Sequence, residues 1–476
     1  MRHNKQQVKS GLVWSAIDSF GNHGIGLVIT LTLANILGPS VYGLVAMLAI
    51  FIAIANVFVN SGFSSALIRK TDRNEKDYAT TFYFSLVVSL IFYGILFLAA
   101  PFIAKFYNQP ELIVLTRIIA LTIVINSFAI IPRTKLVVAL NFKKQAKANF
   151  VALIISGSAG LTMAFYGFGV WTLVAQQLLL VFIGVFMLNI LSPWRPSEKF
   201  CKNAFNELFG FGSKLLASGL LDTIYNNLYG LIIGKQFSAA QLGIFNQAST
   251  LSTLPATTIT NVIQKVTYPM LSAIQADENK LEKAYLKTLK ISTMVIFPVM
   301  FGICIIAEPL IDLLLGQEWQ DSAPMVSILT MAFTLYPIHA INLNMLQVKG
   351  RSDLFLKLEI IKKIIATIAL VVTVPMGIAA MCIGMVVTSY LALFVNTYYT
   401  AKLSSISQLD QFKALLPIGL ITAIAALIGY QLGAEIEINW MKIIIMLSSA
   451  LTAYIVLIVV FQKTLVSEVK TLLKEA

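Results

Sequence analysis

The sequence predicts an all-helical protein that crosses a membrane many times. Of its 476 residues 58% are hydrophobic and only 12% are charged, and the mean hydropathy is +0.81, far above what a soluble chain needs. The apolar residues gather in runs of about 20, the length with which a helix crosses the hydrocarbon layer. The connections between these runs are too short to bury a core. We therefore expect a multi-pass membrane protein without a soluble domain.

Fourteen apolar runs can be distinguished along the chain. They cover residues 11–37, 43–65, 79–104, 112–132, 148–167, 168–191, 211–234, 242–264, 286–307, 323–346, 357–375, 377–400, 414–433 and 440–461. Because fourteen is an even number, both termini are expected on one side. The first run is too long for the apolar part of a signal peptide, so we expect it to be retained.

The distribution of basic residues predicts the orientation. Of the 35 Lys and Arg residues, 31 precede the first run or fall in every second connection and the C-terminal tail. The other side carries only Lys105, Arg117, Lys235 and Lys442. Because basic loops stay inside, we expect both termini on the cytoplasmic side of the membrane. The net charge of +13 follows from this topology and from anionic lipid, and requires no nucleic acid.

An internal repeat divides the chain. Asp18 precedes Asn22 by four residues in the first run, and Asp222 precedes Asn226 by four in the seventh. Six helices separate the copies, so two halves of the same orientation are expected, related by an axis along the membrane normal. We predict two pseudo-symmetric six-helix lobes, 1–191 and 211–400, a cytoplasmic linker 192–210, and two appended helices with a tail, 401–476.

The acids in these runs are candidate site residues. An ionisable group at membrane depth is costly and marks a functional site by default, and residues four apart share a helix face. Asp18 and Asp222 could line a transport pathway and switch protonation, since burial raises a carboxyl pKa. They could equally join helices by hydrogen bonds. We interpret His23 as a packed or cavity-edge residue.

Four basic residues at the predicted inner mouth are candidates for binding phosphate: Arg69, Arg133, Lys214 and Lys265. A pyrophosphate needs several converging cationic donors. The alternative is that these residues only set the topology and snorkel to the interface.

Three prolines lie in the middle of predicted helices, at Pro255, Pro298 and Pro337. Each removes a backbone hydrogen bond and can bend its helix. They are either hinges for gating or static kinks, which membrane helices tolerate.

Patterns for other chemistry are absent from the sequence. It contains no Gly-x-x-x-x-Gly-Lys-Ser/Thr phosphate loop and no His, Cys and carboxylate cluster with metal-ligand spacing. Cys201, Cys304 and Cys382 are isolated. We expect a transporter rather than an enzyme, with no catalytic residue, metal or cofactor.

Several motifs occur in an order that resembles a known family. They are Leu37-Gly38-Pro39-Ser40-Val41-Tyr42-Gly43, Gly62-Phe63-Ser64-Ser65-Ala66-Leu67-Ile68-Arg69, Gly167-Phe168-Gly169-Val170-Trp171-Thr172-Leu173-Val174, Tyr268-Pro269 and Leu315-Gly316-Gln317-Glu318-Trp319. With fourteen runs, the whole chain resembles the polysaccharide exporters of the MOP flippase superfamily, most of all the Wzx-type and colanic-acid or teichuronic-acid exporter branch.

The resemblance implies a V-shaped pair of lobes that flips an undecaprenyl-pyrophosphate-linked oligosaccharide from the inner to the outer leaflet. It implies that helices one, two, seven and eight line a central cavity, with cations for the pyrophosphate. It also implies a lipid-linked substrate and a location in a bacterial inner membrane. The energy would come from an H⁺ or Na⁺ gradient, from substrate supply and removal, or from neither, and a polysaccharide polymerase is a candidate partner. This sequence departs from the pattern, because its first run contains no Arg or Lys.

Two other functions compete with this one. A cation-coupled multidrug antiporter of the same superfamily would need a deep acid cluster, for which Asp18 and Asp222 are candidates. A membrane glycan polymerase or ligase would need a sizeable outer loop. The acidic group around Glu308 and Glu318 is instead typical of a solvated turn.

Overall fold

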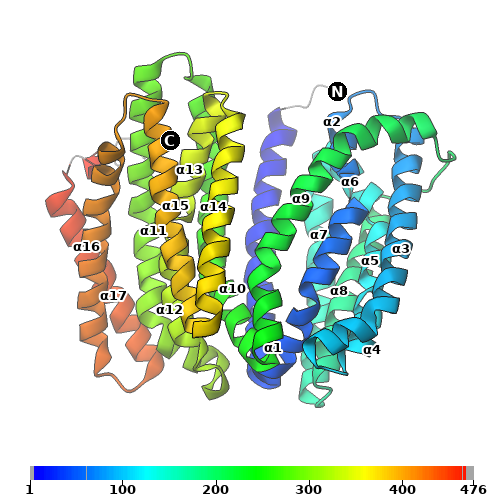
Figure 1. Ribbon diagram of the computed structural model, residues 1–476, viewed down its shortest axis with the longest axis horizontal. Helices are drawn as coiled ribbons and strands as arrows, with labels where there is room; N and C mark the ends of the chain where they lie inside the picture. The colour runs from blue at the N-terminus through cyan, green and yellow to red at the C-terminus, as the bar shows by residue number, and fades with distance from the viewer. Residues whose placement is uncertain (1–4, 61, 464, 468–476) are drawn as a thin grey trace. The chain divides into compact units, whose positions relative to one another are not determined.

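The computed structural model describes residues 5–60, 62–463 and 465–467, without the side chains of 5–13, 15–20, 23 and 352. Every regular element in this part of the chain is a helix (Figure 1). The chain forms two compact units, Met1–Gly243 and Ile244–Ala476. The predicted lobe boundaries at 191 and 211 differ from this division and stay a prediction.

Unit 1 contains nine helices and the first turn of a tenth. They are α1 (Lys5–Asn60), α2 (Phe63–Arg69), α3 (Glu75–Tyr107), α4 (Leu112–Ile119), α5 (Leu121–Ser127), α6 (Ile130–Val138), α7 (Phe142–Phe165), α8 (Val170–Leu191), α9 (Lys202–Gln236) and the start of α10 (Ala239–Ala273).

Unit 2 continues from α10. Its other elements are α11 (Glu278–Leu315), η1 (Gln317–Trp319), α12 (Ser322–Phe333), α13 (Tyr336–Val348), α14 (Ser352–Thr373), η2 (Val374–Met376), α15 (Ile378–Lys402), α16 (Gln408–Ala434) and α17 (Asn439–Phe461).

The predicted all-helical, multi-pass architecture is confirmed, and each predicted run overlaps one or more helices in the predicted order. Within the described residues, nine helices are long and apolar enough to cross a membrane, or ten if the bent segment 112–138 is one span. The long helices α9, α10 and α14 do not reach this threshold. The count of fourteen spans therefore remains a prediction.

The motif Leu37–Gly43 forms a kink followed by a close helix crossing. At Gly38 the backbone leaves the helix, with φ 73° and ψ 171°, and Pro39 starts the second half of α1. There α1 crosses the first turn of α10. A Cβ on Gly43 would lie 1.7 Å from the carbonyl oxygen of Ala239, and a Cβ on Gly243 would lie 2.1 Å from that of Pro39. Both glycines are therefore needed for the two backbones to touch.

Helix α9 is fixed to unit 1 at both of its ends. Near its start, the Glu207 carboxylate accepts a hydrogen bond from Lys70 at 2.8 Å, and Phe205 packs against Phe63 and Phe84. Near its end, Lys235 donates to the carbonyl of Phe106. The second half of the predicted linker 192–210 thus belongs to a continuous helix that begins at Lys202.

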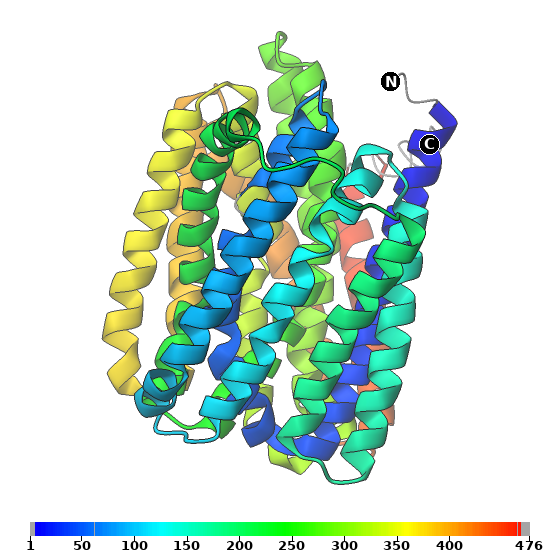
Figure 2. The same cartoon turned by 90° about the vertical axis from the view of Figure 1, so that its right-hand side faces the viewer.

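The linker before α9 crosses the end of unit 1 from α8, as Figure 2 shows. Trp194 lies in this linker, and its indole N–H donates a hydrogen bond of 2.8 Å to the carboxylate of Glu75. Lys135 forms an ion pair with the same carboxylate at 3.0 Å, and its ammonium lies 5.6 Å from the centre of the Trp194 ring. These contacts hold the linker on the start of α3.

The repeat is visible in the local structure of the two units. In each one the fourth predicted span is broken at its middle, between α5 and α6 around Phe128 and between α12 and α13 around Leu335. The helices that correspond to one another, α8 and α15, both begin after a glycine with positive φ, Gly169 and Gly377. The two glycines therefore have the same local role in the two halves, at the start of corresponding helices.

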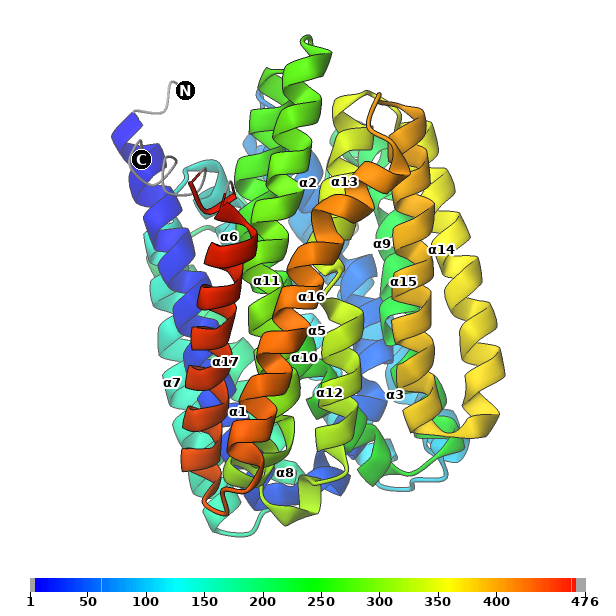
Figure 3. The same cartoon turned by 90° about the vertical axis from the view of Figure 1, so that its left-hand side faces the viewer.

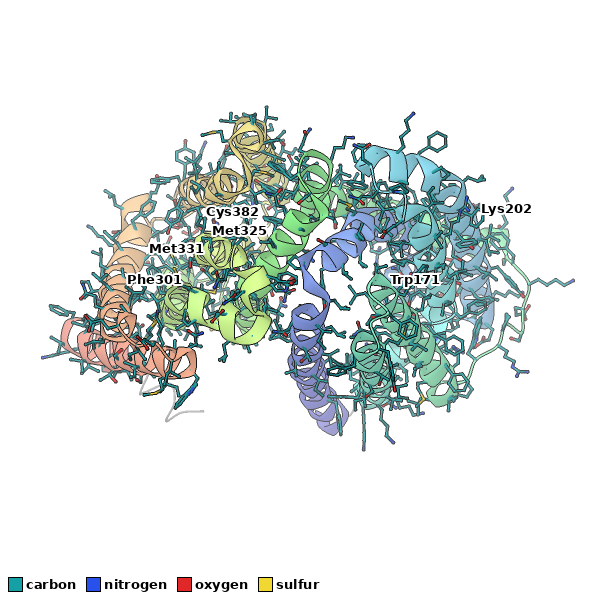
Figure 4. The ribbon with its side chains drawn as sticks, turned by 90° about the horizontal axis from the view of Figure 1, so that it is seen from below. Trp171, Lys202, Phe301, Met325, Met331 and Cys382 are labelled. Atoms are coloured by element: carbon teal, nitrogen blue, oxygen red, sulfur yellow. The ribbon has the colours of Figure 1, made fainter. Side chains whose placement is uncertain are left out.

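The last two helices pack side by side along α11 (Figure 3). Phe301 of α11 lies beside them (Figure 4) and lines an apolar cavity of about 320 Å³ with Leu447, Tyr454 and other residues of the three helices.

The capping box of Ser407 and Asp410 defines the start of α16.

We expect Gly43→Ala and Gly243→Ala each to lower the midpoint of thermal unfolding. The added methyl group would collide with backbone rather than with a movable side chain, at a cost of about 1–3 kcal/mol or more. The measurement is thermal unfolding of the purified chain in detergent. The control is Gly94→Ala in α3, where a Cβ meets nothing within 4 Å and should change stability by no more than about 1 kcal/mol. An unchanged midpoint in both crossing variants would contradict the packing.

Candidate functional site

Unit 1 contains a cavity of about 320 Å³ among α1, α5, α6, α7 and α8. Four of its lining residues are polar: Asn22, Asn126, Arg133 and Asn149. The others are small or aliphatic: Ala152, Leu153, Leu180, Val181, Gly184 and Val185. The cavity therefore brings together two residues that the sequence predicted as candidates, Asn22 and Arg133, from helices far apart in the chain.

The broken fourth span positions two of the polar groups. The segments 112–127 and 130–138 meet at an angle of 43°, with Asn126 just before the bend and Arg133 just after it. Seven residues are about two helical turns, which places both on one side. Arg133 lies five residues before the end of α6, about 8 Å along the helix axis. The charge of Arg133 therefore lies inside the span, and its long side chain can reach the end of α6.

The electrostatic character of the cavity is positive. Arg133 and Asn126 use no side-chain hydrogen bond or ion pair within the described part of the chain. None of the lining residues that the structure describes is an acid. A guanidinium with five free N–H donors, next to three amides that both donate and accept, can bind an oxyanion or sugar hydroxyl groups.

Arg69 lies in a different pocket of about 310 Å³, at the end of α2. Its guanidinium stacks 4.6 Å above the Phe211 ring. Lys70 beside it contacts Asp77 at 3.1 Å and Glu207 at 2.8 Å. The hydrogen bonds that Lys70 donates to Glu207 and to Asp77 raise the pKa of its ammonium. Asp72 also lines this pocket, so its cations are balanced by acids.

The other predicted residues do not join either pocket. Lys214, Asp222 and Asn226 are exposed on α9, and Lys265 is exposed on α10 in unit 2. The side chains of Asp18 and His23 lie outside the described residues. Pro255 and Pro298 lie inside the continuous helices α10 and α11. Pro337 is in the first turn of α13, directly after the break in its span.

Comparison with known proteins identifies the family. The profile of a family described as polysaccharide biosynthesis protein matches residues 32–324, which is more than half of the chain. This chain belongs to that family.

Individual relatives agree with this assignment. The family member described here is 24% identical over 351 residues to the teichuronic acid biosynthesis protein TuaB of Bacillus subtilis, a match that covers 73% of each chain. It is 23% identical over 401 residues to the lipopolysaccharide biosynthesis protein WzxC of Escherichia coli, covering 83% of this chain and 80% of the relative.

Solved structures share the fold. The lipid II flippase MurJ in an inward closed conformation has a TM-score of 0.78 at 13% identity, over 96% of this chain and 100% of that one. An inward-facing multidrug resistance transporter of the MATE family, from the MOP superfamily, has a TM-score of 0.64 at 18% identity, over 82% and 97%. The fold of this family member is thus one that transporters have.

Sequence reasoning missed a buried polar network in unit 2. The hydroxyl of Tyr285 on α11 lies 2.9 Å from the amide oxygen of Asn342 and 2.8 Å from that of Gln411. Thr400 donates to the same Asn342 oxygen at 2.9 Å. Nδ1 of His339 accepts a hydrogen bond from the Asn396 amide at 3.0 Å, and Nε2 lies 3.3 Å from the Ser389 hydroxyl. The sequence feature that could have indicated this network is the presence of amide side chains within apolar runs.

We expect Tyr285→Phe to destabilise this family member by about 1–3 kcal/mol, because the single hydroxyl hydrogen that one of two buried amide oxygens accepts would be lost. Tyr398→Phe is the matched control, since its ring is 54% exposed. Thermal unfolding in detergent compares the two variants with the wild type. Equal midpoints for both variants would show that the network contributes little.

Proposed function

We propose that this protein is a flippase that moves a lipid-linked oligosaccharide, carried on undecaprenyl pyrophosphate, from the inner to the outer leaflet of a bacterial inner membrane. The product would be used to build a surface polysaccharide. The observation that supports this most is the family match over residues 32–324. TuaB and WzxC are named for teichuronic acid and lipopolysaccharide biosynthesis, and MurJ is a flippase for lipid II.

The mechanism would be alternating access. The described helices supply a polar cavity with Arg133 in unit 1 and an apolar cavity along α16 and α17 in unit 2. A substrate with a hydrophilic headgroup and a hydrocarbon tail needs surfaces of both kinds. We propose that Asp222 and Asn226, exposed on α9, face the transport pathway together with Asp18. We further propose that the termini are cytoplasmic, as the distribution of basic residues predicts.

A multidrug antiporter coupled to H⁺ or Na⁺ is the second candidate, because the MATE transporter shares the fold. Cation coupling requires a carboxylate that can be protonated or can bind the ion. The cavity of unit 1 has an arginine and amides in its lining, which disfavours a cation at that place. The likeness to a transporter also leaves little support for a glycan polymerase or ligase.

Deletion of the gene in the bacterium that carries it should trap lipid-linked oligosaccharide on the inner leaflet. The measurement is protection of the labelled glycan from membrane-impermeant periodate in intact spheroplasts. Wild-type protein should restore access. Unchanged surface polysaccharide combined with increased drug sensitivity would favour the antiporter instead.

Asp18→Ala and Asp222→Ala are expected to reduce this restoration if the two acids face the pathway. Both variants must first accumulate in the membrane at the wild-type level, which immunoblotting checks. Lys265→Gln tests in the same assay whether a basic residue of α10 contributes. Full restoration by both aspartate variants would assign the acids to helix packing.

A further inference from the structure

Among the described residues, the cavity of unit 1 contains a cation without an acidic partner. The guanidinium of Arg133 takes part in no ion pair with a described residue, and no acid is among the described residues that line the cavity with it. Arginine stays protonated at every physiological pH, so the charge cannot be removed by losing a proton. A cation inside a membrane span is costly unless an anion or water compensates it. The site therefore favours a ligand with negative charge.

The neighbouring side chains fit the remaining atoms of such a ligand. A guanidinium binds a carboxylate or a phosphate through two parallel N–H donors. Asn126 adds an amide on the other side of the bend, and Asn22 and Asn149 add two more from α1 and α7. Each amide offers both donors and an acceptor, which are the groups that hydroxyl-rich molecules need.

The size of the cavity limits the ligand. Its volume of about 320 Å³ lies at the lower end of the range for small-molecule sites, roughly 300–1,000 Å³. It can hold one charged sugar or one phosphate group, but not an oligosaccharide. The pocket beside Arg69 is less suited to an anion, because Asp72 and Glu207 line it as well.

From this geometry we propose that Arg133, with Asn126 and Asn149, forms an oxyanion-binding site inside unit 1 that takes one anionic group of the transported molecule. This inference rests on the proposed function for the identity of that molecule. The shared chemistry is a phosphate or a carboxylate. The first would come from the lipid carrier, and the second from an acidic sugar of the glycan.

The test uses the full chain in lipid nanodiscs and titration calorimetry with three soluble probes. They are geranyl pyrophosphate, a trisaccharide that contains glucuronic acid, and a glucose trisaccharide as the neutral comparison. Binding of the pyrophosphate alone assigns the site to the carrier phosphate, and binding of the glucuronate alone assigns it to an acidic sugar. Competition between the two supports a general oxyanion site. Binding of neither charged probe overturns the proposal.

Two variants test the residues. Arg133→Gln should weaken the charged probe at least about tenfold, a difference of about 1.4 kcal/mol. Asn126→Asp keeps the size of the side chain and places a carboxylate beside Arg133, so it should abolish anion binding as well. Lys147→Gln is the matched control, because Lys147 is an exposed cation of α7 that does not line the cavity. Unchanged affinity in either cavity variant, or an equal loss in the control, overturns the proposal.

A third measurement separates this inference from the proposed function. If Arg133-dependent binding is found but deletion of the gene leaves surface glycan unchanged, the flippase assignment fails and the oxyanion site stands. If deletion traps the lipid-linked glycan but Arg133→Gln binds the probes like the wild type, the flippase stands and the site fails. Elution of each variant as a single species in size-exclusion chromatography confirms that it is folded.

Discussion

In hydrocarbon, each helix must satisfy its own backbone hydrogen bonds, because no water is available to do so. Both units break this continuity at the same place, the middle of the fourth predicted span. In unit 1 the amide of Asn189 on α8 donates to the carbonyl of Phe128 at 3.4 Å. In unit 2 the hydroxyl of Ser389 on α15 donates to the carbonyl of Ala332 at 2.7 Å. In each unit, a side chain of α8 or of its counterpart α15 thus donates a hydrogen bond to a backbone carbonyl at the break.

Polar side chains gather at these two breaks with different results. In unit 2 they form a closed set around Tyr285 and Asn342, which are both fully buried. Buried hydrogen bonds of this kind make a core more specific. In unit 1 the same region surrounds a cavity with Arg133 in its lining. Both halves therefore have a helix break at this position, while among the described residues only the cavity of the first half has a charged side chain, Arg133, in its lining.

The contacts of α9 explain why it belongs to the compact unit 1 although it opens the second repeat. Lys70 is 12% exposed and Asp77 is 2% exposed, so their ion pair is mostly shielded from solvent, and removing the cation would leave a buried carboxylate. Glu207 of α9, which is 60% exposed, pairs with the same ammonium at the rim. The crossing of Gly43 and Gly243 attaches the first turn of α10 in the same way, through backbone contact. The chain enters unit 2 only after this point.

Sequence alone determined the order and approximate position of the helices, including the boundaries between runs near Gly38 and Gly169. These depend on hydropathy and on backbone preferences, which act locally. It also pointed to the family through motifs of fixed order. The tertiary structure decided which polar residues meet. Asn22 and Arg133 are more than a hundred residues apart, and Asn126 and Asn149 are neutral amides that hydropathy does not single out. Asp222, which the repeat pairs with Asp18, is not among the described lining residues of this cavity. Side-chain contacts depend on the rotation of each helix about its axis and on the bend of the fourth span. The composition of a single helix specifies neither of these.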